Sequence, residues 1–184
     1  MSTGCADPAA SPVNALPAAG SGSALERYFP LEDNKVYAYN TEEHGETGIL
    51  TARAYRLSPT CGELMIAGKR KRFCYAQDQV TNERGNPVLK LPFAVGTEWN
   101  SSHVLRSQIT AVAVTLTVPA GTYKECIEVT ERAQAAAETN AETTAGPRTI
   151  TTYCPQIGIA KLAVVGADGE RATVVLKSYA ALVE

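Results

Sequence analysis

The sequence has little net charge and few residues suited to common catalytic or metal chemistry. It carries 17 Lys and Arg against 19 Asp and Glu, a formal net charge of -2, and only two histidines. Such a balance provides no general field to attract nucleic acid, so we expect no nucleic-acid partner. No apolar run approaches the roughly 20 residues of a membrane helix. Neither a Gly-x-Ser-x-Gly motif nor a phosphate-binding glycine loop occurs, and we expect no cofactor and no metal.

The first 27 residues differ in composition from the rest. From Met1 to Leu25 nearly every residue is Ala, Ser, Pro or Gly, and Asp7 is the one charged side chain. Such a segment buries too little apolar surface to offset the entropy of ordering it. We therefore predict a disordered tether over residues 1–27 and a single folded domain over residues 28–184, a suitable length for one core.

Cys5 follows three small residues and precedes the polar tract. This arrangement resembles the processing site of a bacterial lipoprotein, in which the cysteine becomes the lipidated first residue. Ser2 stands where that pattern usually has Leu, and an unmodified cysteine in a tail is the alternative. The resemblance implies a membrane partner reached through a lipid anchor on Cys5. Ala6, in place of Asp, further implies sorting to the outer membrane.

After Tyr28 the chain alternates β-branched or aromatic residues with polar ones, and turn signals separate the segments. Short links join antiparallel neighbours, since parallel crossovers need a dozen or more residues. We predict an all-β fold, an antiparallel meander curled into a half-barrel or open sandwich, with Val112, Val114, Leu116 and Val118 on the buried face of one strand. The expected strands are 35–40, 48–57, 63–67, 71–77, 103–106, 109–118, 125–132, 148–153, 159–165 and 173–181.

The four body cysteines fit the register of two hairpins. If a hairpin turns at Ala67-Gly68, the numbers of directly opposed residues sum to 135. The numbers of Cys61 and Cys74 have this sum. Arg132 and Arg148 flank a polar insertion symmetrically, so opposed residues of this second hairpin have numbers that sum to 280. The numbers of Cys126 and Cys154 have this sum. Opposed cysteines at a non-hydrogen-bonded antiparallel position can form a disulfide. We predict the bridges Cys61–Cys74 and Cys126–Cys154.

Free thiols and a tetrathiolate zinc site are the alternatives to these bridges. Zinc sites usually contain cysteines two to four residues apart, and neither of these pairs does. Disulfides require an oxidising compartment. Together with the N-terminal segment they favour the bacterial cell envelope, either anchored at the outer membrane or periplasmic or secreted.

Several short motifs occur in a fixed order along the body. They are Tyr28-Phe29-Pro30-Leu31, Tyr37-Ala38-Tyr39, Leu91-Pro92-Phe93, Gly96-Thr97-Glu98-Trp99, Val118-Pro119-Ala120-Gly121-Thr122-Tyr123 and Gly158-Ile159-Ala160-Lys161. This set resembles a broad group of poorly characterised bacterial secreted proteins and lipoproteins, and is similar to a LolA-like half-barrel. The resemblance implies an envelope protein and supplies no catalytic residue.

Three residues are candidates for contact with a ligand or partner. Trp99, the single tryptophan, is interpreted as a core anchor, with ligand stacking as the alternative. Arg70 and Arg72 lie on one side of a basic strand that would protect a sheet edge, with partner docking as the alternative. His44 and His103 have charged or serine neighbours. We expect His44 to be solvated and His103 to be solvated or at the edge of the core, rather than catalytic or metal-binding.

These features favour a non-catalytic binding or structural module of the cell envelope, with an unknown envelope protein as its partner. One alternative is a carrier that holds a lipid or other apolar ligand in a concave sheet face. A second is a hydrolase whose site is assembled from residues scattered along the chain.

Overall fold

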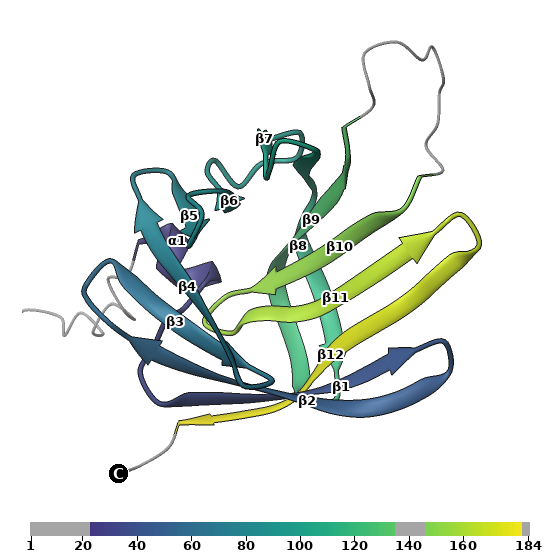
Figure 1. Cartoon of the computed structure of the whole chain (residues 1–184), viewed down its shortest axis with the longest axis horizontal. Coiled ribbons are helices and arrows are strands. Elements are labelled where there is room, and N and C mark those ends of the chain that lie inside the picture. The colour runs from purple at the N-terminus through teal and green to yellow at the C-terminus, as the bar shows by residue number, and fades with distance from the viewer. Residues whose placement is uncertain (1–22, 135–145, 182–184) are drawn as a thin grey trace, which may run out of the picture.

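The computed structural model describes residues 23–134 and 146–181, which form an antiparallel sheet and one short helix (Figure 1). The predicted all-β class is confirmed. The strands are β1 (Lys35–Glu43), β2 (Glu46–Arg56), β3 (Cys61–Ile66), β4 (Lys69–Ala76), β5 (Gln79–Asn82), β6 (Pro87–Lys90), β7 (Glu98–Asn100), β8 (Leu105–Val118), β9 (Gly121–Ala133), β10 (Arg148–Cys154), β11 (Gly158–Gly166) and β12 (Gly169–Ala181).

The sheet follows the chain as a meander and curls into a nearly closed barrel. Each strand pairs with the next one along the chain except β6 with β7, and β1 pairs with β12. The order β6-β5-β4-β3-β2-β1-β12-β11-β10-β9-β8-β7 therefore leaves one seam, between β6 and β7. The two halves of the meander are joined by β1 and β12, which no local turn connects.

Two-residue turns set the register of two hairpins. His44-Gly45 and Ala67-Gly68 have positive φ at both positions, 51° and 83° in the first turn and 48° and 76° in the second. This is the backbone of a type I′ turn, whose twist matches that of the flanking strands. The second turn places Cys61 opposite Cys74, as the register predicts.

The helix α1 (Ala24–Tyr28) and residues 29–31, which together we call the plug, fill one end of the barrel, the plugged end. The Ser23 hydroxyl and the Glu26 carboxylate form a capping box, so this short turn is satisfied at its N-terminus. Leu25 and Tyr28 are buried. Residues 24–27 of the predicted tether thus belong to this helix, and positions 1–22 lie outside the described residues. The described part of the chain has no helix long and apolar enough to cross a bilayer.

The plug packs tightly against the sheet wall. Leu31 is fully buried, and a Cβ at Gly62 of β3 would lie 2.8 Å from the Leu31 Cβ and 2.7 Å from the Tyr55 carbonyl oxygen. The Tyr75 hydroxyl donates to the Phe29 carbonyl oxygen at 2.7 Å and accepts from the Leu31 backbone N–H at 3.1 Å. These contacts fix the plug where only a glycine allows its approach.

The predicted buried face of β8 is wrong in part. Val118 is buried, but Val112 is 38% exposed. Ala113 has a positive φ of 54°, and the pairing of β8 with β9 shifts register on both sides of it. Such an irregularity changes the face to which the following residues point, so the simple alternation fails there.

Candidate functional site

An apolar cavity lies inside the barrel, next to the plug. Its volume is about 150 Å³, and its walls come from strands on both sides of the β1–β12 pair. Leu64, Leu162 and Val174 are only half-buried although they line this interior, so the inner surface is incompletely packed. An engineered apolar cavity of about 150 Å³ in another protein stays dry and binds benzene. The space thus suits an apolar group of similar cross-section. The lining includes Tyr37, Tyr39, Ala52, Leu64, Leu162 and Val174.

Two tyrosines give the cavity wall a limited polar character. The Tyr37 and Tyr39 rings stack with centroids 6.3 Å apart. Burial raises the pKa of both hydroxyls above the usual value, which keeps both neutral and able to donate. The Tyr39 hydroxyl donates to the Ile159 carbonyl oxygen at 3.1 Å. Tyr37 is 3% exposed, and its hydroxyl makes no hydrogen bond with any described residue.

Sequence reasoning singled out Tyr37 and Tyr39 only as part of the motif set and assigned no cavity to them, although one signal was present. Tyr37 and Tyr39 alternate with Val36 and Ala38, which places both rings on one face of the strand. That alternation predicts a shared face. Whether the shared face is filled depends on Phe29 and on strands far away in the chain.

A second hollow, which we call the mouth, lies towards the end of the barrel opposite the plug. Its volume is about 450 Å³, and the β5–β6 turn, the β7–β8 loop and the inner faces of β9 and β10 line it. Leu162 lines both the cavity and the mouth. The two hollows are therefore neighbours that share the Leu162 side chain as a wall.

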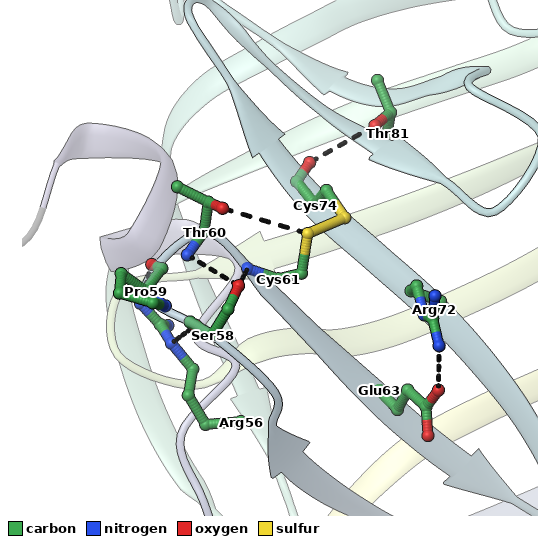
Figure 2. Close-up of a disulfide and its surroundings, with 9 residues drawn as sticks. All are labelled: Arg56, Ser58, Pro59, Thr60, Cys61, Glu63, Arg72, Cys74 and Thr81. Atoms are coloured by element: carbon green, nitrogen blue, oxygen red, sulfur yellow. Dashed lines mark hydrogen bonds and ion pairs between the residues drawn. A yellow bond between two sulfur atoms is a disulfide. The ribbon is translucent and has the colours of Figure 1, made fainter.

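The predicted disulfides are both present in the structure. Cys61 and Cys74 have Cα atoms 4.1 Å apart and are half-buried, whereas Cys126 and Cys154 have Cα atoms 4.2 Å apart and are fully buried. Around the first bridge, Figure 2 shows Arg72 facing Glu63, the cross-strand pair that the register predicts. The Cys61 backbone N–H also donates to the Ser58 hydroxyl at 3.0 Å.

Trp99 closes the seam of the barrel instead of facing an open site. Its side chain is 6% exposed, and its indole N–H on β7 donates to the Pro87 carbonyl oxygen on β6 at 3.1 Å. The ring belongs to the same buried cluster as Val80 and Leu89. This position favours the core-anchor interpretation over ligand stacking.

Arg70 and Arg72 lie together on the exposed surface of β4. Their side chains are 76% and 57% exposed, and both approach the Glu63 carboxylate, at 3.8 Å and 3.2 Å. Only Phe73–Ala76 of this strand pairs with β5, so the basic half extends past its neighbour. The charged run thus covers a local edge, as the sequence favours.

Neither histidine contributes to a reactive cluster in the described residues. His44 lies in the β1–β2 turn and His103 in the β7–β8 loop, both exposed. Neither side chain makes a hydrogen bond with the described part of the chain. Within residues 23–134 and 146–181, no group of three His, Cys, Asp or Glu side chains is arranged to hold a metal ion. Cys5 lies outside the described residues.

The similarity of this chain to known structures is in its fold, a nearly closed antiparallel barrel with a short helix in one end. No family model matches it, and no curated protein matches it significantly. The crystal structure of a protein from Bacteroides fragilis, titled as an exported protein with a YmcC-like fold, has the same fold at 13% identity, with a TM-score of 0.51. The match covers 83% of this chain and 98% of that one. A protein from Parabacteroides distasonis, titled as a lipoprotein, matches at 12% identity, with a TM-score of 0.48 and the same coverage of both chains.

Proposed function

We propose that this chain is a non-catalytic binding module of the bacterial cell envelope that holds an apolar ligand inside its barrel. The observation that carries the proposal is the apolar cavity beside the plug, lined by half-buried Leu64, Leu162 and Val174. A ligand would cover apolar surface that the fold itself leaves partly exposed, and each square ångström covered contributes about 25 cal/mol. The LolA-like resemblance of the sequence suggests a carrier of the same kind.

The envelope location rests on separate observations. Both disulfides need an oxidising compartment, and the similar Bacteroides fragilis structure is titled as an exported protein. We propose that a lipid on Cys5 anchors the domain, with Ala6 directing it to the outer membrane. The segment between Cys5 and α1 would then connect the plugged end of the barrel to the membrane surface.

A cavity-filling variant tests the binding proposal. Ala52 lies in the cavity wall between Tyr37 and Ile66, and Ala52→Phe would place a ring in the space. We expect the fluorescent apolar probe N-phenyl-1-naphthylamine to bind the wild type saturably. Because the apolar site is filled, we expect Ala52→Phe to weaken that binding by about tenfold or more, a loss of about 1.4 kcal/mol.

Ala38→Phe is the matched control, since Ala38 lies on the opposite face of β1 and lines no part of the cavity. It should bind the probe as the wild type does. Thermal unfolding of both variants checks that they are folded. Equal probe affinity in folded Ala52→Phe and wild type would show that the cavity is not the binding site.

A docking or structural module is the second candidate function. The exposed basic side chains of Arg70 and Arg72 favour it, because they form a charged surface on the outer face of β4 and neither lines the cavity. In that case the cavity variant would leave function unchanged, while reversal of these charges would abolish partner binding.

A further inference from the structure

The inner surface of the barrel changes from apolar to polar between the cavity and the mouth. In the ladder, Leu162 of the cavity wall stands opposite Thr151 of β10, so both side chains lie on the inner face. Two residues further from the plug on the same face are Thr149 and, opposite it on β9, Glu131. An elongated ligand with its apolar end in the cavity would therefore meet hydroxyl and carboxylate groups at its other end.

Glu131 is the charged group on this surface that lacks a cationic partner. Its carboxylate accepts a hydrogen bond from the Ser107 hydroxyl at 3.3 Å, and Ser107 is 3% exposed. No Lys, Arg or His side chain among the described residues forms an ion pair with Glu131. A carboxylate can accept about four hydrogen bonds, so most of its capacity is available to a ligand.

A second polar atom at the mouth is buried without a partner. The Ser101 hydroxyl oxygen, in the β7–β8 loop, is buried and makes no hydrogen bond in the described part of the chain. Buried polar groups are usually paired, and an unpaired one costs about 1–3 kcal/mol.

The charges around the mouth favour an uncharged ligand head. Lys71 and Arg84 supply two positive groups, and Glu83 and Glu131 supply two negative ones, which gives a formal sum of zero. Lys71 and Glu83 already form an ion pair at 3.7 Å. With no net formal charge at the mouth, recognition would depend on hydrogen bonds, and Glu131 is the carboxylate acceptor there that no cation pairs with among the described residues.

We propose that the ligand is a single-chain amphiphile whose uncharged, hydroxyl-bearing head lies at the mouth and donates hydrogen bonds to Glu131. The inference rests on the proposed binding function and specifies the ligand of the same site. A cavity of about 150 Å³ accommodates part of one chain and not two side by side. The remainder of that chain would extend past Leu162 towards Thr151 and the mouth.

Three amphiphiles with the same tail length test the head group. Below their micelle-forming concentrations, dodecanoylglycerol, dodecanoate and dodecyltrimethylammonium would each displace N-phenyl-1-naphthylamine from the full chain. We expect dodecanoylglycerol to bind about tenfold or more tightly than either charged compound, since one hydrogen bond to a charged acceptor can supply that factor.

Glu131→Gln tests the acceptor, and Glu128→Gln, on the opposite face of β9, is its matched control. The glutamine can still accept from Ser107, so the fold should be kept. We expect Glu131→Gln to weaken dodecanoylglycerol binding about tenfold and to leave the naphthylamine probe unaffected, and Glu128→Gln to change neither.

The outcomes separate the two proposals. If the probe binds at the cavity but the three head groups bind equally, or Glu131→Gln has no effect, the head-group proposal is wrong and the binding function stands. Tighter binding of either charged compound would also overturn it. If neither probe nor amphiphile binds the wild type, the proposed function itself fails.

Discussion

Replacing both Cys126 and Cys154 with alanine is expected to lower the free energy of unfolding by roughly 4–5 kcal/mol, near the upper end of the effect of a native disulfide. The bridge closes a segment with a sequence separation of 28, for which the chain-entropy model gives roughly 3.5 kcal/mol. Both residues are fully buried in the core beside Leu176, so loss of the two sulfur atoms also leaves a cavity. Urea unfolding followed by far-UV circular dichroism measures the change.

The double variant Cys61→Ala, Cys74→Ala provides the comparison. This bridge has a sequence separation of 13 and is half-buried, so we expect a loss of roughly 3 kcal/mol without a large cavity contribution. The difference between the two losses in free energy of unfolding tests whether the Cys126–Cys154 bridge is the more deeply buried one. A larger loss from the half-buried pair would contradict the account of how the barrel is stabilised.

Trp99→Ala is expected to destabilise the protein by roughly 3–5 kcal/mol, the usual cost of removing a large buried aromatic side chain. The ring packs at the seam where β6 and β7 are not paired, and its indole N–H supplies a hydrogen bond across that seam. No ladder of backbone hydrogen bonds compensates for its loss there. Urea unfolding measures the stability, and hydrogen exchange of Val88 and Leu89 in β6 reports on the seam itself.

Trp99→Phe separates packing from the hydrogen bond. Phenylalanine keeps most of the apolar contact but leaves the Pro87 carbonyl oxygen without its donor, so we expect a smaller loss of about 1–2 kcal/mol. If Trp99→Ala costs less than about 1 kcal/mol, well below that usual range, the indole does not close the barrel.

The parts of this fold that depend on local pairing could be predicted from the sequence. The positions of Cys61 and Cys74 about the Ala67-Gly68 turn, and of Cys126 and Cys154 about the insertion, fixed two registers by arithmetic. Antiparallel neighbours joined by short turns have one favoured register, so local spacing is sufficient there.

Features that depend on distant or very short segments could not be predicted in this way. Nothing local pairs β1 with β12, and the strands β5, β6 and β7 have three or four residues each, too few to show a period. The boundary at residue 28 rests on composition, which gives no sign of the capping box at Ser23 or of the burial of Leu25. Local composition does not reveal that α1 has a barrel end to fill.

In the candidate site, too, local sequence predicts some features, and others depend on distant segments. Alternation places Tyr37 and Tyr39 on one face, but the cavity exists because strands from both halves of the meander surround them. Glu131 likewise has an ordinary sequence context. Its significance comes from facing inwards beside Ser107, with no cation paired to it among the described residues.

The most direct test of the central claim is native mass spectrometry of the full chain, exported in a bacterial host and purified without detergent. The account predicts that the wild type carries a bound apolar or amphiphilic molecule, released on unfolding, and that Ala52→Phe purified in parallel carries none. A wild type that has only the mass of the protein, and that takes up no dodecanoylglycerol when it is supplied, would contradict the claim that this barrel binds an apolar ligand.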